Sequence, residues 1–190
     1  MRVEKLHFLV HPGLVYYALA KGRIKRTRVD EEGLMEVFRN KINSIGEKEL
    51  LTILLPNPKE ELGEDFRNHQ AWVEFARYAR ERLGRRCVVI SSPPEVEREP
   101  LQNDLRKALR VFQSRGFEFS TETPTEVWGV SVLRCVLDTY EELEETFNFR
   151  NIFIPLQATN AHGIRKEEID KLARELEVRR GRKFKITDRV

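Results

Sequence analysis

The stretch LLTILLPNP, residues 50–58, decides the fold class of this chain. Its first six residues are apolar except for one threonine, and apolar and polar positions do not alternate along it. An uninterrupted apolar run of this length is typical of a strand that is buried on both faces, as in a parallel sheet covered by helices. Pro56 and Pro58 end the run, because proline donates no backbone hydrogen bond. The stretch therefore predicts the interior of an α/β sheet.

Strands and helices alternate on both sides of this stretch. Further strands are predicted at 5–10, 87–90, 126–132 and 152–156. Helical spacing of apolar residues predicts helices over 30–45, 65–83, 101–115, 133–147 and 166–179. Short strands are expected at 117–119 and 184–186, and residues 14–29 fit either a hairpin or a short helix with an arm. This alternation predicts an α/β fold, namely a three-layer, doubly wound, mainly parallel sheet of five or six strands with helices on both faces.

Length and composition predict one domain that covers residues 1–190. Apolar residues make up 40% of the chain and include eleven Phe, which excludes an intrinsically disordered protein. No window approaches ~18 uninterrupted apolar residues, so we expect no membrane partner. With two cysteines and no leader pattern, a cytoplasmic location is expected. Charged residues reach 34%, and this abundance, with few Met and Cys, is typical of proteins from thermophiles.

Polar side chains follow several of the predicted strands. In an open parallel sheet, ligands bind beyond the carboxyl ends of the strands, where the strand order reverses. We expect a substrate to be bound there by Asn57, Ser91, Ser92, Thr159 and Asn160. His11 and His162 follow strands at the same edge, and either can act as a general base. The alternative is that such residues simply end strands, as they do in proteins of every function.

The sequence predicts neither a metal site nor a bound cofactor. The histidines and cysteines do not occur at the spacing of a zinc site. No glycine-rich motif that binds a dinucleotide or a triphosphate follows any predicted strand. A small molecule, acted on directly by side chains, is therefore the expected ligand.

Cys135 is the candidate nucleophile. It lies near the beginning of the predicted helix 133–147, where the helix dipole favours the thiolate. A thiolate there would attack a carbonyl or nitrile carbon, with His11 or His162 as the base. The alternative is a small buried side chain, because Val132, Leu133, Val136 and Leu137 flank it.

The segment GVSVLRCV, residues 129–136, resembles the segment that carries the nucleophile in isochorismatase-like cysteine hydrolases. Glycine, valine, cysteine and the following valine fall at the same spacing, and residues 152–159 lie where the next strand of that family ends. The resemblance implies the α/β fold of these cysteine hydrolases, with Cys135 as the nucleophile. In the family, an aspartate closes the first strand and a lysine follows the third, whereas this chain has His11 and Ser91–Pro94 there. The resemblance therefore bears on the fold more than on the activity.

The net charge and its distribution along the chain indicate which kinds of partner to expect. The net charge is +3, so we expect a small molecule rather than nucleic acid as the partner. An acidic run over 138–145 stands against separate basic clusters, which favours self-association into a homo-oligomer. A nucleic-acid partner would use the basic residues of the arm at 21–28. These are Arg23, Lys25, Arg26 and Arg28.

Three functions are open on this basis. The favoured one is a small-molecule hydrolase-like or ligand-binding protein with its site at the carboxyl edge of the sheet. The first alternative is a catalytically inactive oligomeric binding or scaffold protein. The second is a nucleic-acid-associated protein that uses the arm at 21–28. The sequence does not decide whether the chain is an enzyme.

Overall fold

A computed structural model describes six segments of the chain and parts of a seventh. The segments are 1–12, 31–56, 66–92, 98–130, 135–155 and 158. The C-terminal part is described at 171, 174–175, 177–178, 180–181 and 183–187. The predicted arm at 14–29 lies outside the described residues.

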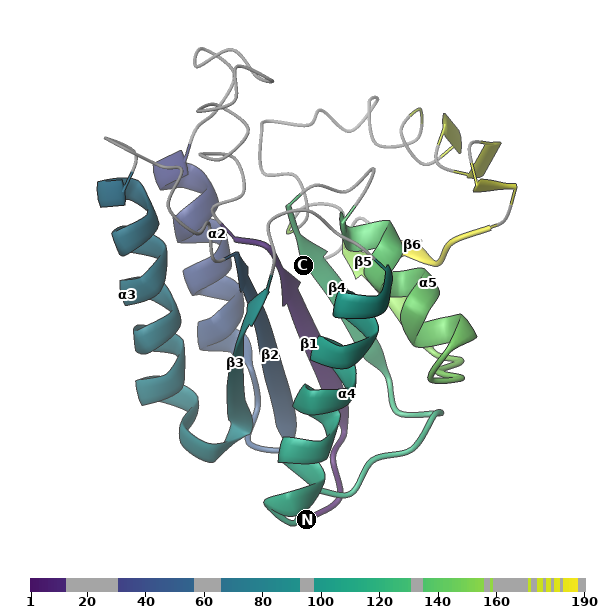
Figure 1. Cartoon of the computed structure of the whole chain (residues 1–190), viewed down its shortest axis with the longest axis horizontal. Helices are drawn as coiled ribbons and strands as arrows, with labels where there is room; N and C mark the ends of the chain where they lie inside the picture. The colour runs from purple at the N-terminus through teal and green to yellow at the C-terminus, as the bar shows by residue number, and fades with distance from the viewer. Residues whose placement is uncertain are drawn as a thin grey trace.

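Six parallel strands form one sheet (Figure 1). They are β1 (Lys5–Val10), β2 (Glu49–Pro56), β3 (Cys87–Ser92), β4 (Thr125–Gly129), β5 (Ile152–Pro155) and β6 (Ile186–Thr187). Their order across the sheet is β3-β2-β1-β4-β5-β6, and every neighbouring pair is parallel. This is the order of a Rossmann-like doubly wound sheet, so the predicted fold class is confirmed.

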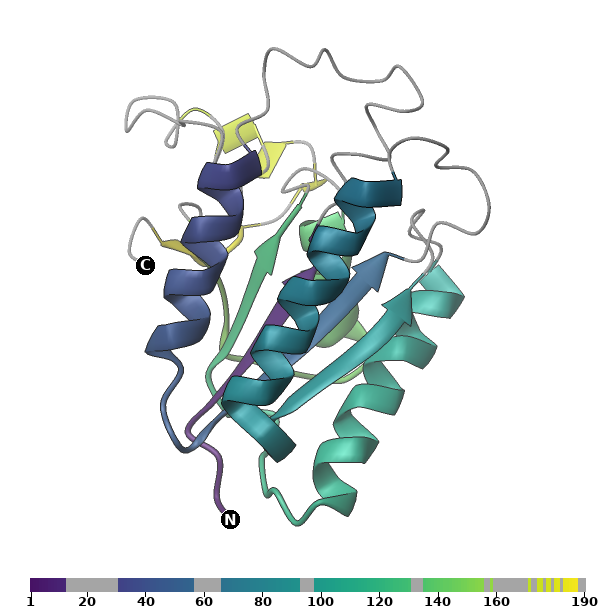
Figure 2. The same cartoon turned by 90° about the vertical axis from the view of Figure 1, so that its left-hand side faces the viewer.

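Helices cover both faces of the sheet (Figures 1 and 2). On one face lie α2 (Glu31–Ser44) and α3 (Phe66–Leu83), and α3 runs into a short 3-10 turn, η3 (Gly84–Arg86). On the other face lie α4 (Arg98–Ser114) and α5 (Leu137–Glu145). Side chains of β1 alternate between the two apolar layers, with Phe8 packed toward α4 and α5 and Leu9 toward α2 and α3. The sheet is thus buried on both faces, as the run at 50–55 predicted.

The strand order reverses between β1 and β4. After β3 the chain returns through α4, so that β4 pairs with the other side of β1 and Gly129 lies opposite Val10. The backbone N–H of Val130 donates to the carbonyl oxygen of Val10 over 2.9 Å. Gly129 has a φ of +129°, outside the strand conformation, and β4 therefore ends there rather than at the predicted residue 132. The carboxyl ends of β1 and β4 flank the switch point.

The two short strands expected at 117–119 and 184–186 also differ from the prediction. Residues 117–119 form no strand and make only an isolated bridge between Arg2 and Glu118. The last strand begins at Ile186, two residues later than expected. Among the described helices, none has the length and apolar character that crossing a membrane requires.

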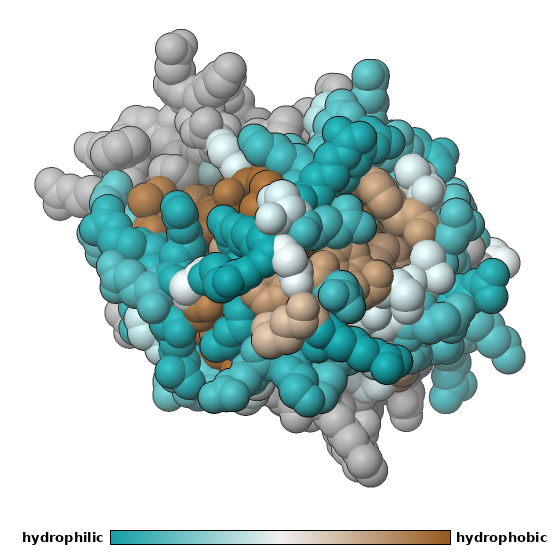
Figure 3. Space-filling view, turned by 90° about the horizontal axis from the view of Figure 1, so that it is seen from below, coloured by the Kyte–Doolittle hydropathy of each residue, from teal (hydrophilic) through white to brown (hydrophobic). Residues whose placement is uncertain are grey.

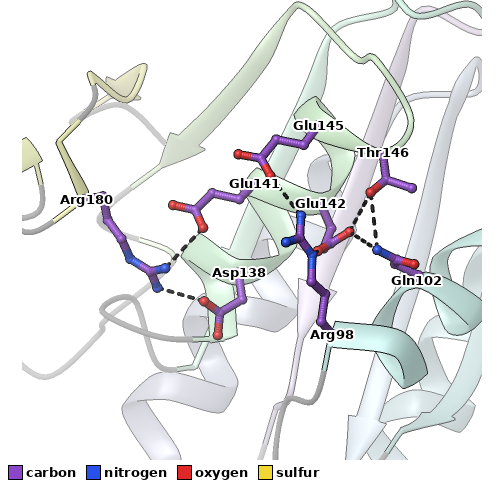
Figure 4. A network of polar contacts seen from close by, with 8 residues as sticks. All are labelled: Arg98, Gln102, Asp138, Glu141, Glu142, Glu145, Thr146 and Arg180. Carbon is purple, nitrogen blue, oxygen red and sulfur yellow. Dashed lines mark hydrogen bonds and ion pairs between the residues drawn. The ribbon is translucent and has the colours of Figure 1, made fainter.

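Charged side chains tie the C-terminal part of the chain and α4 to α5 (Figure 4). Arg180 lies 2.7 Å from a carboxylate oxygen of Asp138 and 3.1 Å from one of Glu141. From α4, Arg98 pairs with Glu142 and Glu145. Two arginines therefore pair with four of the five acidic residues in the run at 138–145, and the run keeps a net negative charge.

Candidate functional site

His11 directly follows β1 and lies beside the switch point. Its backbone φ is +48°, a left-handed conformation that histidine adopts more readily than most residues, and this turns the chain out of the strand. The backbone N–H of His11 donates to the carbonyl oxygen of Leu54 on β2 over 2.9 Å. The residue is only 1% exposed, so its ring is held inside the carboxyl edge of the sheet.

The ring of His11 belongs to a chain of three polar side chains. Its Nε2 lies 3.3 Å from the hydroxyl oxygen of Ser92, which is buried at the end of β3. The side chain of Ser92 also hydrogen-bonds to Asp104 on α4. Within the part of the chain that the structure describes, Nδ1 of His11 and Oδ2 of Asp104 are buried and have no hydrogen-bond partner. We call these three side chains the His11–Ser92–Asp104 chain.

Burial shifts the pKa values of His11 and Asp104. It lowers the pKa of His11 to about 4, because a charged imidazolium is poorly solvated there. His11 is therefore neutral at pH 7, with one ring nitrogen as donor and the other as acceptor. Burial raises the pKa of Asp104, while the hydrogen bond from Ser92 and the charge of Lys107 act in the opposite direction.

The structure brings together two of the residues that the sequence predicted at this edge. His11 and Ser92 are in contact, whereas Ser91 is exposed and its side chain points to the opposite face of β3. Several other predicted residues lie outside the described part of the chain. They are Asn57, Thr159, Asn160 and His162, and Arg23, Lys25, Arg26 and Arg28 of the arm.

Cys135 lies in the apolar layer beneath α4 and α5. It precedes α5 in a short π-helical turn, and the residue is 3% exposed. Its layer includes Val136, Leu137 and Tyr140. The carbonyl oxygen of Cys135 accepts a hydrogen bond from the hydroxyl of Thr139 over 2.8 Å. The residue thus stands at a helix beginning, as expected, but among apolar neighbours.

Sequence reasoning did not include Asp104. It lies early in α4, the helix that follows β3, and so at the same edge of the sheet as Ser92. On the predicted helix 101–115 it is next to Leu105, which belongs to the apolar stripe. A carboxylate beside the apolar stripe, early in a helix that starts at the carboxyl edge, is the signal that would have found it.

A second group of charged side chains lies near the amino end of the sheet and has a structural role. Nε2 of His7 is 3.1 Å from a carboxylate oxygen of Glu49, and Nδ1 is 3.3 Å from one of Glu126. Lys41 of α2, also buried, lies 2.7 Å from the same oxygen of Glu126. Burial raises the pKa of Glu126, but the hydrogen bonds and charges of His7 and Lys41 outweigh it and hold that pKa well below its usual range. Within the described residues, Nδ1 of His7 makes no well-aligned hydrogen bond, as is true of Nδ1 of His11, but both nitrogens of His7 lie within 3.3 Å of a carboxylate oxygen.

The surface has hollows away from the His11–Ser92–Asp104 chain. One of about 880 Å³ lies at the amino edge and is lined by residues such as Met1, Lys48 and Glu118. Seen from below, that side of the molecule shows mostly hydrophilic side chains with apolar ones between them (Figure 3). None of the residues that line this hollow has a buried polar atom without a partner. The chemistry of the described residues therefore favours the carboxyl edge of the sheet, rather than this hollow, as the candidate functional site.

Comparisons with known proteins leave the geometry as the basis for assigning a function. No protein-family model, no curated protein and no solved structure matches this chain. Among the described residues, no group of three or more His, Cys, Asp and Glu side chains is arranged to hold a metal ion. The site that emerges is the His11–Ser92–Asp104 chain at the switch point of the sheet.

Proposed function

We propose that this protein binds a small polar molecule at the carboxyl edge of its sheet, beside the junction of β1 and β4, through the ring of His11. The observation that carries the proposal is the buried Nδ1 of His11, which has no partner in the described part of the chain. Its position supports the proposal, because open α/β sheets bind ligands where the strand order reverses.

The free-energy cost of leaving Nδ1 of His11 without a partner also supports ligand binding at this site. Leaving a buried hydrogen-bonding group without a partner costs about 1–3 kcal/mol. Folded proteins contain few such groups, and those that persist call for a role. A ligand group that donates to Nδ1 would recover this free energy on binding. The neutral charge of His11 at pH 7 suits a proton acceptor or a general base.

A hydrolase that uses Cys135 is the more demanding version of this proposal. The resemblance to isochorismatase-like hydrolases implies that Cys135 attacks the substrate and that His11 takes the place of the family's acid. His11 has polar partners at the edge of the sheet, whereas Cys135 lies in the apolar layer. Binding through His11 is therefore better supported by the geometry than hydrolysis through Cys135.

NMR of the full chain with ¹⁵N-labelled histidine tests the proposal. A panel of small amides, alcohols, sugars and hydroxy acids is added while the ring signals of His11 and His7 are followed. His7 is a matched internal control, since it is a buried histidine within β1, the strand that His11 follows, and its two ring nitrogens both lie against carboxylates. We expect at least one class of molecule to shift the signals of His11 and to leave those of His7 in place.

The variant His11→Asn controls for binding elsewhere, because asparagine tolerates the left-handed conformation at position 11 but has no ring. Binding that persists in a folded His11→Asn variant would place the ligand elsewhere. A panel in which no molecule shifts the His11 signals would contradict the proposed function.

A further inference from the structure

We infer that Ser92 and Asp104 hold the proton of the His11 ring on Nε2, so that Nδ1 is an acceptor and the site takes a ligand with a neutral N–H or O–H donor. This inference rests on the proposed function and names the class of ligand. Ser92 and Asp104 are positioning residues in this scheme, since they act through the ring of His11.

The direction of the hydrogen bonds follows from the donors available. An ionised carboxylate only accepts, so Ser92 must donate its single proton to Asp104. The hydroxyl oxygen of Ser92 then has only lone pairs to offer to His11. Because Nε2 of His11 lies 3.3 Å from that oxygen, it has to carry the ring proton and donate it. A neutral imidazole has one proton, so Nδ1 is left with its lone pair.

The opposite arrangement has weaker hydrogen bonds. If Ser92 donated to Nε2, the carboxylate of Asp104 would lose its bond from the hydroxyl. The ring proton would move to Nδ1, a buried atom with no acceptor in the described part of the chain. Hydrogen bonds to a charged group are stronger than those between neutral groups, so the first arrangement is favoured.

The ligand class follows from the acceptor. A lone pair in a neutral ring binds an amide N–H or a hydroxyl and repels the oxygen atoms of an anion. Sulfate, which has no proton at neutral pH, is therefore a poor ligand for Nδ1, whereas acetamide offers N–H donors. An anion without a proton would have to be held elsewhere.

The ¹⁵N shifts of the His11 ring test the inference in the full-length protein. We expect a protonated Nε2 and an unprotonated Nδ1 in the wild type and in Ser92→Thr, which keeps the hydroxyl. Ser92→Ala should contain a mixture of both tautomers, and it should bind acetamide about tenfold more weakly, as the loss of one supporting hydrogen bond predicts. Acetamide should shift Nδ1 of His11 in the wild type, and sulfate at the same concentration should not.

Asp104→Asn provides a second variant with little change in shape if Ser92→Ala fails to fold. We expect it to weaken the preference for the Nε2 proton, since the amide replaces a charged acceptor. A wild-type ring protonated on Nδ1 would overturn the inference, whatever ligand is bound. A response to sulfate and not to acetamide would also overturn it, yet would leave the proposed binding function intact. The proposed function fails separately, when no molecule of the panel shifts the His11 signals.

Discussion

Gly129 and Val10 pack so closely that position 129 has no room for a side chain. A Cβ atom there would lie 2.7 Å from the backbone nitrogen of Val10 and closer still to its carbonyl oxygen. The φ of +129° at Gly129 adds a conformation that other residues rarely adopt. We expect Gly129→Ala to lower the free energy of unfolding by about 3 kcal/mol, from backbone strain and overpacking together. Urea denaturation measures this loss.

Gly84 provides the matched control for the crowding at Gly129. Its φ is +57°, but an added Cβ would meet nothing within 4 Å. Gly84→Ala should therefore cost only about 1 kcal/mol, the conformational part of the effect. Equal losses in the two variants would show that the contact with Val10 does not limit position 129.

The burial of His11 makes the protein sensitive to mild acid. The pKa of His11 falls from 6.5 to about 4 on folding, so the folded state resists protonation that the unfolded state accepts. The stabilisation is complete above pH 6.5 and is lost as the pH falls through 4, a change of about 3 kcal/mol at 1.36 kcal/mol per pKa unit. His11→Asn should lack this change, and denaturation curves between pH 7 and 4 would show it. Parallel pH profiles for variant and wild type would argue against a buried neutral ring.

Glu49 makes the stability of the protein depend on pH in a second, more acidic range. A hydrogen bond from His7 lowers the pKa of Glu49 to about 2. Its contribution to stability is present above its ordinary pKa of 4.5 and disappears as the pH falls toward 2. We expect Glu49→Gln to be less stable than the wild type at pH 7, with the difference shrinking below pH 4.5. A difference that stays constant down to pH 2 would mean that the charge of Glu49 contributes nothing.

Arg180 anchors the last strand. Its two ion pairs with α5 are only partly exposed, so Arg180→Ala should cost about 1 kcal/mol. Because the backbone N–H of Ile154 donates to the carbonyl oxygen of Lys185, hydrogen exchange at Ile154 should become faster when this segment loosens. Lys171→Ala, which removes an exposed pair with Glu175, is the control and should leave that exchange unchanged. Unaltered exchange in Arg180→Ala would show that β6 is held by its strand pairing alone.

The two thiols test the role of Cys135. Burial raises the pKa of Cys87 to about 12, and both cysteines are almost fully buried. We expect iodoacetamide to label both slowly in the folded protein and rapidly in urea, as mass spectrometry would show. Fast labelling of Cys135 alone in the folded protein would contradict this and would favour the hydrolase that the resemblance implies.

Periodicity was enough to predict the layers of this fold. The apolar run at 50–55 is buried because helices cover both faces of the sheet, and the alternation of strands and helices leaves few other architectures. Boundaries were less accurate where a single backbone angle decides them. The strand predicted to reach residue 132 ends at Gly129, because no sequence pattern reports the φ of that glycine.

The candidate site was predictable only in part. The rule that ligands bind at the carboxyl edge selected His11 and Ser92 from the sequence. Their contact was not predictable, because it depends on β2 lying between β1 and β3, and a sequence does not state strand order. Asp104 could have been selected as a carboxylate beside the apolar stripe of the predicted helix 101–115, but its hydrogen bond with Ser92 depends on α4 packing beside the end of β3. The acidic run at 138–145 favours self-association on the sequence alone, and its pairing with Arg98 and Arg180 could not be predicted, because both arginines are distant from it in the sequence.

The central place of β1 has a consequence for how the chain is made. Ribosomes produce β1 before the other five strands, and β2 can pair with one edge of β1 soon afterwards. The other side has to wait for β4, which follows β3 and α4 in the chain. Until then the nascent chain presents an apolar, unpaired strand edge of the kind that promotes aggregation. A chaperone that shields this edge should therefore raise the yield of folded protein more than changes to the finished surface.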